Sequence, residues 1–193
     1  MSKFKLNLSL TKAATLMMLA TIGLQMGCAN AGSNRMTASD VNFNVTHSGS
    51  VSVDVGASGS SLSTGVKSFF AGTRISNAAF RAALEESVRI SGLFKVGISG
   101  TDSDYQLNAK IVSQKDNSTL GFATNMTSTL NVEYVLTRRS DSKVLMRKTV
   151  RSSSTATMGD SLIGVNRYKK AVEGAAQNNI RQALRSISQL DLS

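Results

Sequence analysis

The sequence has few of the side chains from which catalytic and metal sites are built. Its 193 residues include one cysteine, Cys28, one histidine, His47, no proline and no tryptophan. A single cysteine cannot form an intramolecular disulfide, so packing must hold the fold together. No cluster of His, Cys and acidic residues has metal-site spacing, and a Ser-His-acid triad would have to use His47. The composition therefore predicts no metal, no cofactor and no enzymatic activity, and it favours a surface-loop position for His47.

The first 28 residues have the pattern of an export signal. The positive start consists of Lys3, Lys5 and Lys12. An apolar run over residues 13–24 follows, and the small Gly27 stands directly before Cys28. The run is about 12 residues long, whereas a membrane-spanning helix needs about 20. The pattern resembles a bacterial lipoprotein signal, although Gln25 stands where that class usually has an aliphatic residue. The alternative is an ordinary secretory signal with a cysteine nearby.

The lipoprotein resemblance implies that the chain is cut before Cys28 and that Cys28 carries the lipid. Ala29 and Asn30 follow, and in this class the absence of an Asp directly after the cysteine favours the outer membrane. Cleavage removes three of the 22 basic residues and none of the 12 acids, which leaves a net charge of +7. A basic exported protein is expected to meet the anions of the envelope, which are lipopolysaccharide, phospholipid headgroups and peptidoglycan. Nucleic acid is not an expected partner. General solubility is the competing explanation of the charge.

Periodicity divides the rest of the chain into a tether and one folded domain. Residues 29–40 are small and polar, which is typical of a flexible segment. Residues 41–45 and 51–55 alternate apolar and polar side chains, which predicts two strands. The glycine- and serine-rich residues 56–65 predict a loop. We therefore expect a signal peptide over 1–27, a lipidated flexible tether over 28–40 and a periplasmic α+β domain over 41–193.

Two amphipathic helices are predicted. The first begins after the N-cap Ser76 and ends at Gly92, which has the position of a C′ glycine. Its apolar stripe consists of Phe80, Ala83, Leu84, Ser87 and Val88. The second covers residues 166–190, about 37 Å at 1.5 Å per residue, and Arg167 lies off its stripe. That stripe consists of Tyr168, Val172, Ala175, Ala176, Asn179, Ile180, Ala183, Leu184 and Ile187. The small residues at 174–176 favour a close approach to a sheet.

Three further strands are predicted over residues 105–111, 130–136 and 144–150, and residues 138–143 predict the hairpin turn between the last two. In the third strand Val144, Met146 and Val150 are expected on one face. One face of these strands needs a cover, which the helices supply. The order of elements predicts the α+β class, with a single domain in which an antiparallel sheet has two amphipathic helices packed on one face.

Basic residues concentrate in the last hairpin, where the only acid over 14 positions is Asp141. They are Arg138, Arg139, Lys143, Arg147, Lys148 and Arg151. Period-two spacing puts Arg147 and Arg151 on the strand face opposite Met146. Two interpretations stay open, a solvated sheet face and a binding face for an anionic glycolipid or an acidic partner.

Four stretches, 80–94, 104–109, 132–136 and 171–180, together resemble a group of small Gram-negative outer-membrane lipoproteins. The predicted architecture is also similar to that of lipopolysaccharide-assembly lipoproteins and of the lipoprotein activators of peptidoglycan synthases. These resemblances contribute no catalytic residue and imply binding and scaffolding.

We therefore expect a lipid-anchored binding or scaffolding subunit of a cell-envelope assembly, at the periplasmic face of the outer membrane. The alternative is a monomeric periplasmic binder of an apolar or anionic envelope ligand, such as a lipid or glycolipid. The expected partners are outer-membrane lipid through acylated Cys28, a protein of an envelope complex, and lipopolysaccharide or peptidoglycan.

Overall fold

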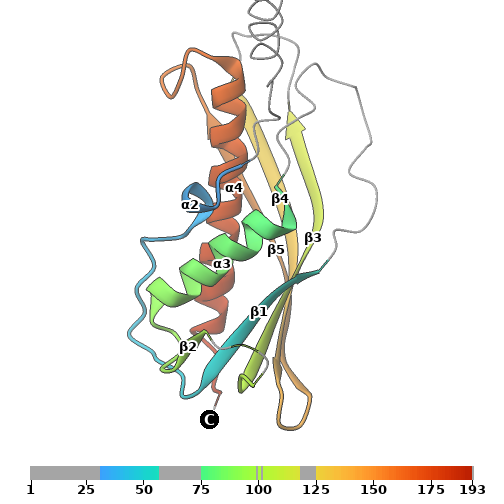
Figure 1. Cartoon of the computed structure of the whole chain (residues 1–193). Helices are drawn as coiled ribbons and strands as arrows, with labels where there is room; N and C mark the ends of the chain where they lie inside the picture. The colour runs from blue at the N-terminus through green and yellow to red at the C-terminus, as the bar shows by residue number, and fades with distance from the viewer. Residues whose placement is uncertain (1–30, 57–74, 99, 101, 118–124, 193) are drawn as a thin grey trace, which may run out of the picture.

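The computed structural model describes residues 31–56, 75–98, 100, 102–117 and 125–192, which form a five-stranded sheet with helices on one side (Figure 1). The strands are β1 (Ser50–Gly56), β2 (Gly97–Ile98), β3 (Tyr105–Asn117), β4 (Met126–Arg138) and β5 (Lys143–Ala156). The helices are α2 (Ser33–Met36), α3 (Asn77–Ser91) and α4 (Gly164–Ile187). The predicted α+β class and single domain are confirmed. The predicted signal over 1–27 and most of the predicted loop over 56–65 lie outside the described residues.

The sheet is mostly antiparallel and has the strand order β2-β1-β3-β4-β5. β3, β4 and β5 pair in the antiparallel way that the sequence predicts, whereas β1 runs parallel to both of its neighbours. Parallel neighbours need a crossover connection, and α3 lies in the chain between β1 and β3. The helix that covers this part of the sheet therefore also accounts for the parallel pairing.

α3 begins and ends where the sequence predicts. The Ser76 side-chain oxygen accepts a hydrogen bond from Ala79 N at 3.1 Å, and Gly92 has a φ of 63° after the last helical residue. The whole predicted stripe from Phe80 to Val88 is buried, and α3 contacts β1. Capping and apolar periodicity agree here, which is why the boundaries are so readable from the sequence.

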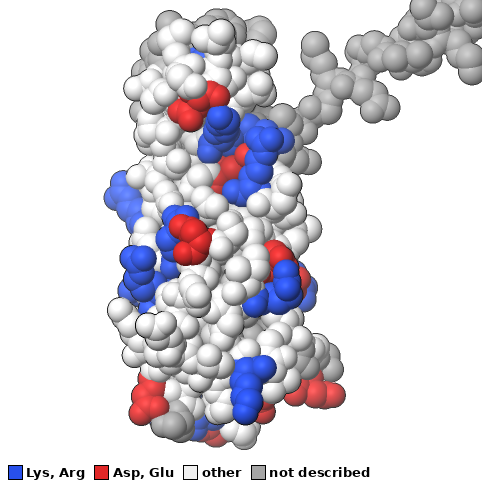
Figure 2. All heavy atoms as spheres, turned by 90° about the vertical axis from the view of Figure 1, so that its left-hand side faces the viewer, with Lys and Arg blue, Asp and Glu red and all other residues white. Residues whose placement is uncertain are grey.

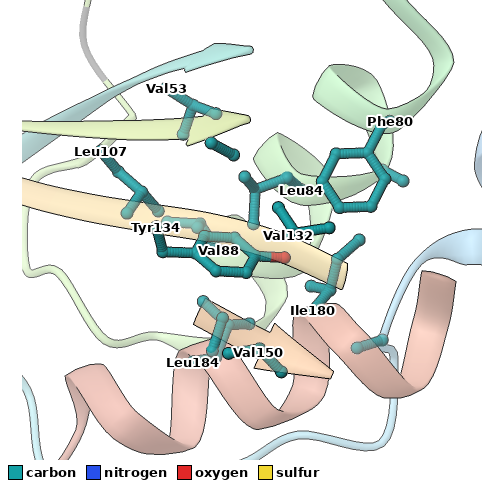
Figure 3. Packing of buried hydrophobic residues seen from close by; sticks show 14 of the residues in the cluster. Val53, Phe80, Leu84, Val88, Leu107, Val132, Tyr134, Val150, Ile180 and Leu184 are labelled. Atoms are coloured by element: carbon teal, nitrogen blue, oxygen red, sulfur yellow. The ribbon is translucent and has the colours of Figure 1, made fainter. Parts of the chain in front are cut away.

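α4 packs along β4 and β5 and closes the core. Leu107, Tyr134 and Ile180 are fully buried where the helices meet the sheet (Figure 3). Burying one Leu or Ile side chain contributes about 1.5–3 kcal/mol. Gly174 allows the close approach, because a Cβ there would lie 3.0 Å from Ser154 Cβ and closer still to its hydroxyl. Among the described helices, none is both long enough and apolar enough to cross a membrane.

A polar network lies inside the α4–sheet interface. The Tyr134 hydroxyl donates to Asn179 Oδ1 at 2.9 Å, and Asn179 Nδ2 donates to Val150 O at 2.9 Å and to Ser152 Oγ at 3.0 Å. Ser152 Oγ donates in turn to Ala175 O at 2.8 Å. Burial raises the pKa of Tyr134 well above its ordinary value of 10.0, so the phenol stays a neutral donor. A satisfied network of this kind fixes how α4 sits on the sheet.

Residues 31–40 are packed on the domain, so the prediction of a flexible tether is wrong over these residues. Met36 and Ala38 are fully buried, and α2 contacts both α3 and α4. The Gly32 N–H donates to the buried carboxylate of Glu173 at 2.8 Å. The polar composition is misleading here because tertiary hydrogen bonds and the two buried side chains of Met36 and Ala38, rather than a periodic apolar stripe, hold the segment in place. The packed domain therefore includes residues 31–40, which precede its predicted start at residue 41.

Residues 41–45 form no strand in spite of their alternation. β1 already pairs on both sides, and His47, just beyond the segment, makes an isolated parallel bridge with Phe94 outside the named strands. His47 is buried, not on a surface loop as predicted. Its Nε2 lies 3.1 Å from Ile187 O, and its ring centroid lies 5.7 Å from that of Phe94. This histidine therefore packs against the end of α4.

A register shift in β5 corrects one further detail. Val144 is exposed, whereas Met146 and Val150 are buried as predicted. The pairing passes from Leu136 opposite Met146 to Thr137 opposite Val144, so one extra residue is inserted in β5. A bulge of this kind turns the side chains beyond it to the other face, which a strict period of two does not anticipate.

Candidate interaction surface

The predicted basic residues of β5 are divided between the two faces of the sheet. Arg147 and Arg151 alternate with the buried Met146 and Val150, so they project from the sheet face opposite the described helices. Lys148 projects on the helix side, where its Nζ donates to a serine hydroxyl of α4 at 2.9 Å. The structure therefore does not gather the six basic residues into one patch.

On the open face Arg147 meets an acid that the sequence argument did not consider. Its Nη1 lies 2.9 Å from Oε1 of Glu133, which comes from the neighbouring β4. Alternation along β4 already puts Glu133 on the polar face, but only the strand register brings it beside Arg147. An exposed pair of this kind contributes about 0–1 kcal/mol. It also neutralises one of the two arginines predicted to form a basic strand face.

At the β4–β5 turn the charges are paired to different degrees. Arg138 Nη1 lies 3.9 Å from the Asp141 carboxylate, and the Asp141 side chain also accepts from Lys143 N at 3.1 Å. Within the described residues, the side chains of Lys143 and Arg151 form no ion pair. Because β5 is the last strand of the sheet, these two cations also discourage pairing with another strand edge. Lys143 and Arg151 are thus the most available charges of the predicted set.

Beside this turn lies an open hollow of about 650 Å³, here called the end hollow. It is lined by Ser48, Gly49, Asp102, Ser103, Asp104, Tyr105, Arg138, Arg139 and Ser140. Arg139 Nη2 also donates to Ser52 Oγ on β1 at 3.1 Å. Two carboxylates and two guanidinium groups meet in this space, so it offers both donors and acceptors to a polar group.

Asp104 organises the end hollow. Its carboxylate accepts from Ser50 N at 2.7 Å and from Ser50 Oγ at 2.9 Å, and its backbone carbonyl accepts from Arg139 N at 2.9 Å. The Ser50 backbone N–H, followed by the Ser50 hydroxyl, lowers the pKa of Asp104 from its ordinary 3.8. Gly49 has a φ of +100°, and a Cβ there would lie 2.8 Å from the Asp104 carboxylate. Sequence periodicity misses this site because it depends on loop contacts.

The helix side carries charges of both signs, and Figure 2 shows them interspersed among uncharged surface. Arg81 and Glu85 pair along α3 at 2.9 Å, and Arg181 of α4 binds Asp40 at 2.7 Å. The hydrogen bond from Arg181 lowers the pKa of the Asp40 carboxyl. In the described part of the chain, no three His, Cys, Asp or Glu side chains are placed to share a metal ion.

Cys28, the predicted lipidation site, lies outside the described residues. The described chain begins at Ala31, which is already buried. Only two residues therefore separate the predicted acylation site from the packed domain.

No family model matches the sequence, and no curated protein matches it. The fold is similar to that of a Xanthomonas campestris protein of the family DUF330, with 14% identity over 76% of this chain and 91% of that one, at a TM-score of 0.52. A candidate lipoprotein from Caulobacter crescentus is 10% identical over 81% and 91%, at a TM-score of 0.46. The PelC dodecamer protein from Paraburkholderia phytofirmans is 13% identical over 75% and 91%, at a TM-score of 0.44. At such identities the Xanthomonas likeness shows a shared fold, and function has to be argued from this chain's own residues.

Proposed function

We propose that the chain is a lipid-anchored protein of the outer membrane whose periplasmic domain is a binding or scaffolding subunit of a cell-envelope assembly. The observation that carries the proposal is the combination of an export signal ending in Gly27-Cys28 with a domain that is already packed at Ala31. In this proposal the domain binds and does not catalyse.

The short connection has a mechanical consequence. Three residues of chain span at most about 10 Å, so an acyl group on Cys28 would hold the domain against the membrane surface. Gly32 is bonded to the buried Glu173, so the pull of the anchor would pass directly into α4. A subunit held in this way meets membrane-bound partners in a restricted orientation.

The free edge of β5 is the candidate docking surface for a protein partner. β5 is 14 residues long and pairs with one strand, β4, among the described strands, so within the described residues one row of its backbone groups forms no strand pairing. Lys143 and Arg151 would favour an acidic partner segment and reject a second basic edge. The competing explanation is that these cations only protect the edge.

A monomeric binder of an anionic envelope ligand is the second candidate, and the end hollow favours it. Arg138 and Arg139 present guanidinium donors there, which suit phosphate or carboxylate groups of a glycolipid. An apolar ligand inside the fold has less support, because side chains such as Leu107 and Leu184 fill the space between the sheet and α4 (Figure 3).

Extraction in mild detergent followed by affinity purification distinguishes the two candidates. A subunit should co-purify with the same partner proteins in repeated preparations, and a ligand binder should stay monomeric and carry lipid in its native mass spectrum. The matched control is the Lys143→Glu, Arg151→Glu double variant, which should lose partners docked at β5. A monomer with neither partner nor ligand in every preparation would contradict the proposal.

A further inference from the structure

The loop between β5 and α4 exposes an unusual number of large apolar side chains. The β5–α4 loop comprises residues 157–163 and is taken together with the first two residues of α4; the exposed fractions are 46% for Met158, 80% for Leu162, 61% for Ile163 and 39% for Val165. Single exposed apolar residues are common on proteins and need no explanation. Four of them within eight residues form a patch, and such patches mark interaction sites.

The loop is built to hold these side chains outward. The Asp160 carboxylate accepts from Thr157 N at 2.8 Å and from Thr157 Oγ1 at 3.0 Å. Lys170 Nζ donates to Asp160 O at 2.7 Å, and the buried Arg167 donates from Nη1 to Ser161 O at 2.7 Å. These bonds fix the polar residues of the loop to its own backbone and to α4. The apolar side chains between them are left in solvent.

The loop also lies at the end of the molecule where the anchor would be. In Figure 1 the loop is at the upper end of α4, above α2. Along α4, Gly164 is nine residues from Glu173, about 14 Å at 1.5 Å per residue. Gly32 is bonded to Glu173, and Cys28 lies within about 10 Å of Ala31. A lipid attached to Cys28 can therefore enter a membrane whose surface lies level with the loop.

We infer that the β5–α4 loop inserts Leu162 and Ile163 into the same lipid monolayer that holds acylated Cys28. The inference rests on the lipid anchor of the proposed function. A bilayer within reach of Cys28 supplies apolar surface to this end in every copy of the protein. The loop's one acid, Asp160, lies 3.9 Å from Lys170 Nζ, so no unpaired negative charge opposes entry. Domain and anchor then form two contacts with the membrane, which fix the orientation of the sheet.

A tryptophan reporter tests insertion directly, because the chain has no tryptophan of its own. The lipidated Leu162→Trp protein is reconstituted in vesicles of phosphatidylethanolamine and phosphatidylglycerol with brominated acyl chains. Its fluorescence should be blue-shifted and lose most of its intensity. The matched control is Ser140→Trp in the exposed β4–β5 turn at the opposite end, which should be unquenched. Quenching of Leu162→Trp no stronger than that of Ser140→Trp overturns the inference.

A second measurement separates the loop from the anchor. In the unlipidated Cys28→Ser chain, Leu162→Ser with Ile163→Ser should weaken vesicle binding by about a hundredfold or more, as expected for losing two inserted apolar side chains. The control pair Val96→Ser with Val144→Ser removes exposed apolar side chains elsewhere and should leave binding unchanged. If the two pairs of substitutions weaken vesicle binding equally, insertion of the loop is overturned, even if Cys28 is acylated in the parent protein. A mature parent protein that carries no acyl groups overturns the anchor, and quenching of Leu162→Trp in that protein leaves the loop standing. If the protein self-associates and this association shields Leu162→Trp from brominated lipid, lipid insertion is overturned and the loop instead contacts a second copy of the chain.

Discussion

The two ends of the molecule differ in what they expose and in what holds them. The β5–α4 loop, at the upper end in Figure 1, presents apolar side chains on a frame of hydrogen bonds from Arg167 and Asp160. The end hollow, at the opposite end of the sheet, presents carboxylates and guanidinium groups organised by Asp104. Each end has a polar support, but exposed apolar side chains are concentrated at the β5–α4 loop, whereas Val144 beside the β4–β5 turn is a single exposed apolar residue. In the proposed arrangement this difference gives the domain a lipid-facing end and a water-facing end.

The largest stability effect is expected at the apolar end. Arg167→Ala should lower the free energy of unfolding by about 3 kcal/mol, because it removes a buried side chain and its bond to Ser161 O. Urea unfolding at pH 7 measures the loss. Arg185→Ala, an exposed arginine on the same helix, is the control and should change stability by at most about 0.5 kcal/mol. Equal losses in the two variants would show that Arg167 does not support the loop.

The polar end should respond to pH. Hydrogen bonds from Ser50 depress the pKa of Asp104 in the folded protein, so its ionised form stabilises the fold above its ordinary pKa of 3.8. That contribution is lost as the pH falls through the lower, folded-state pKa. Asp104→Asn should therefore be less stable than the parent at pH 7, and the difference should shrink at pH values below 3.8. Chemical unfolding of both proteins across this range is the measurement.

A control for this titration lies two residues away. Asp102 lines the same hollow and makes no hydrogen bond with the described residues, so Asp102→Asn should leave stability at pH 7 unchanged. A difference between Asp104→Asn and the parent that stays constant from neutral to acidic pH would contradict the role of the carboxylate.

Charge reversal on β5 should have the smallest effect on folding. Lys143→Glu with Arg151→Glu should change stability by about 0–1 kcal/mol, because neither side chain has an ion-pair partner among the described residues. Partner or anionic-ligand binding should weaken, most clearly at low ionic strength, because salt screens exposed charges over about 8 Å at physiological concentration. If this double variant binds as well as the parent at low salt, the two cations make no binding contact and only protect a solvated strand edge.

The neighbouring choice, Arg147→Glu with Arg151→Glu, is less informative. It would replace the 2.9 Å pair between Arg147 and Glu133 by two adjacent carboxylates. Like charges at this position destabilise the sheet, so a loss of binding would be mixed with a loss of stability.

Local periodicity was sufficient to predict both long helices and the strands β1, β3, β4 and β5. Ser76, Gly92 and the stripe of α4 lie where the pattern predicts because each feature depends on neighbours within a few residues. The failures have non-local causes. The segment 31–40 is fixed by Glu173, far away in the chain, and His47 is buried by the end of α4. Arg167, off the apolar stripe, is buried by the loop that it holds.

The candidate site was predictable in composition but not in arrangement. The sequence alone shows that six basic residues are concentrated in the last hairpin. Their role in binding an anion or a partner stays a prediction. Strand register decides that Glu133 neutralises Arg147, whereas simple alternation with Met146 and Val150 already turns Lys148 toward α4. The end hollow brings together loops from three parts of the chain, so no local pattern announces it.

The most direct test of the account is the fate of a Cys28→Ser protein in fractionated cells, together with the intact mass of the mature parent. The mature parent should begin at Cys28, carry acyl groups and sediment with the outer membrane. The variant should keep its fold and lose most of its membrane association, with only the weak contribution of the β5–α4 loop remaining. A parent without acyl groups, or a variant that stays in the outer-membrane fraction at the parent's level, would contradict the anchored domain.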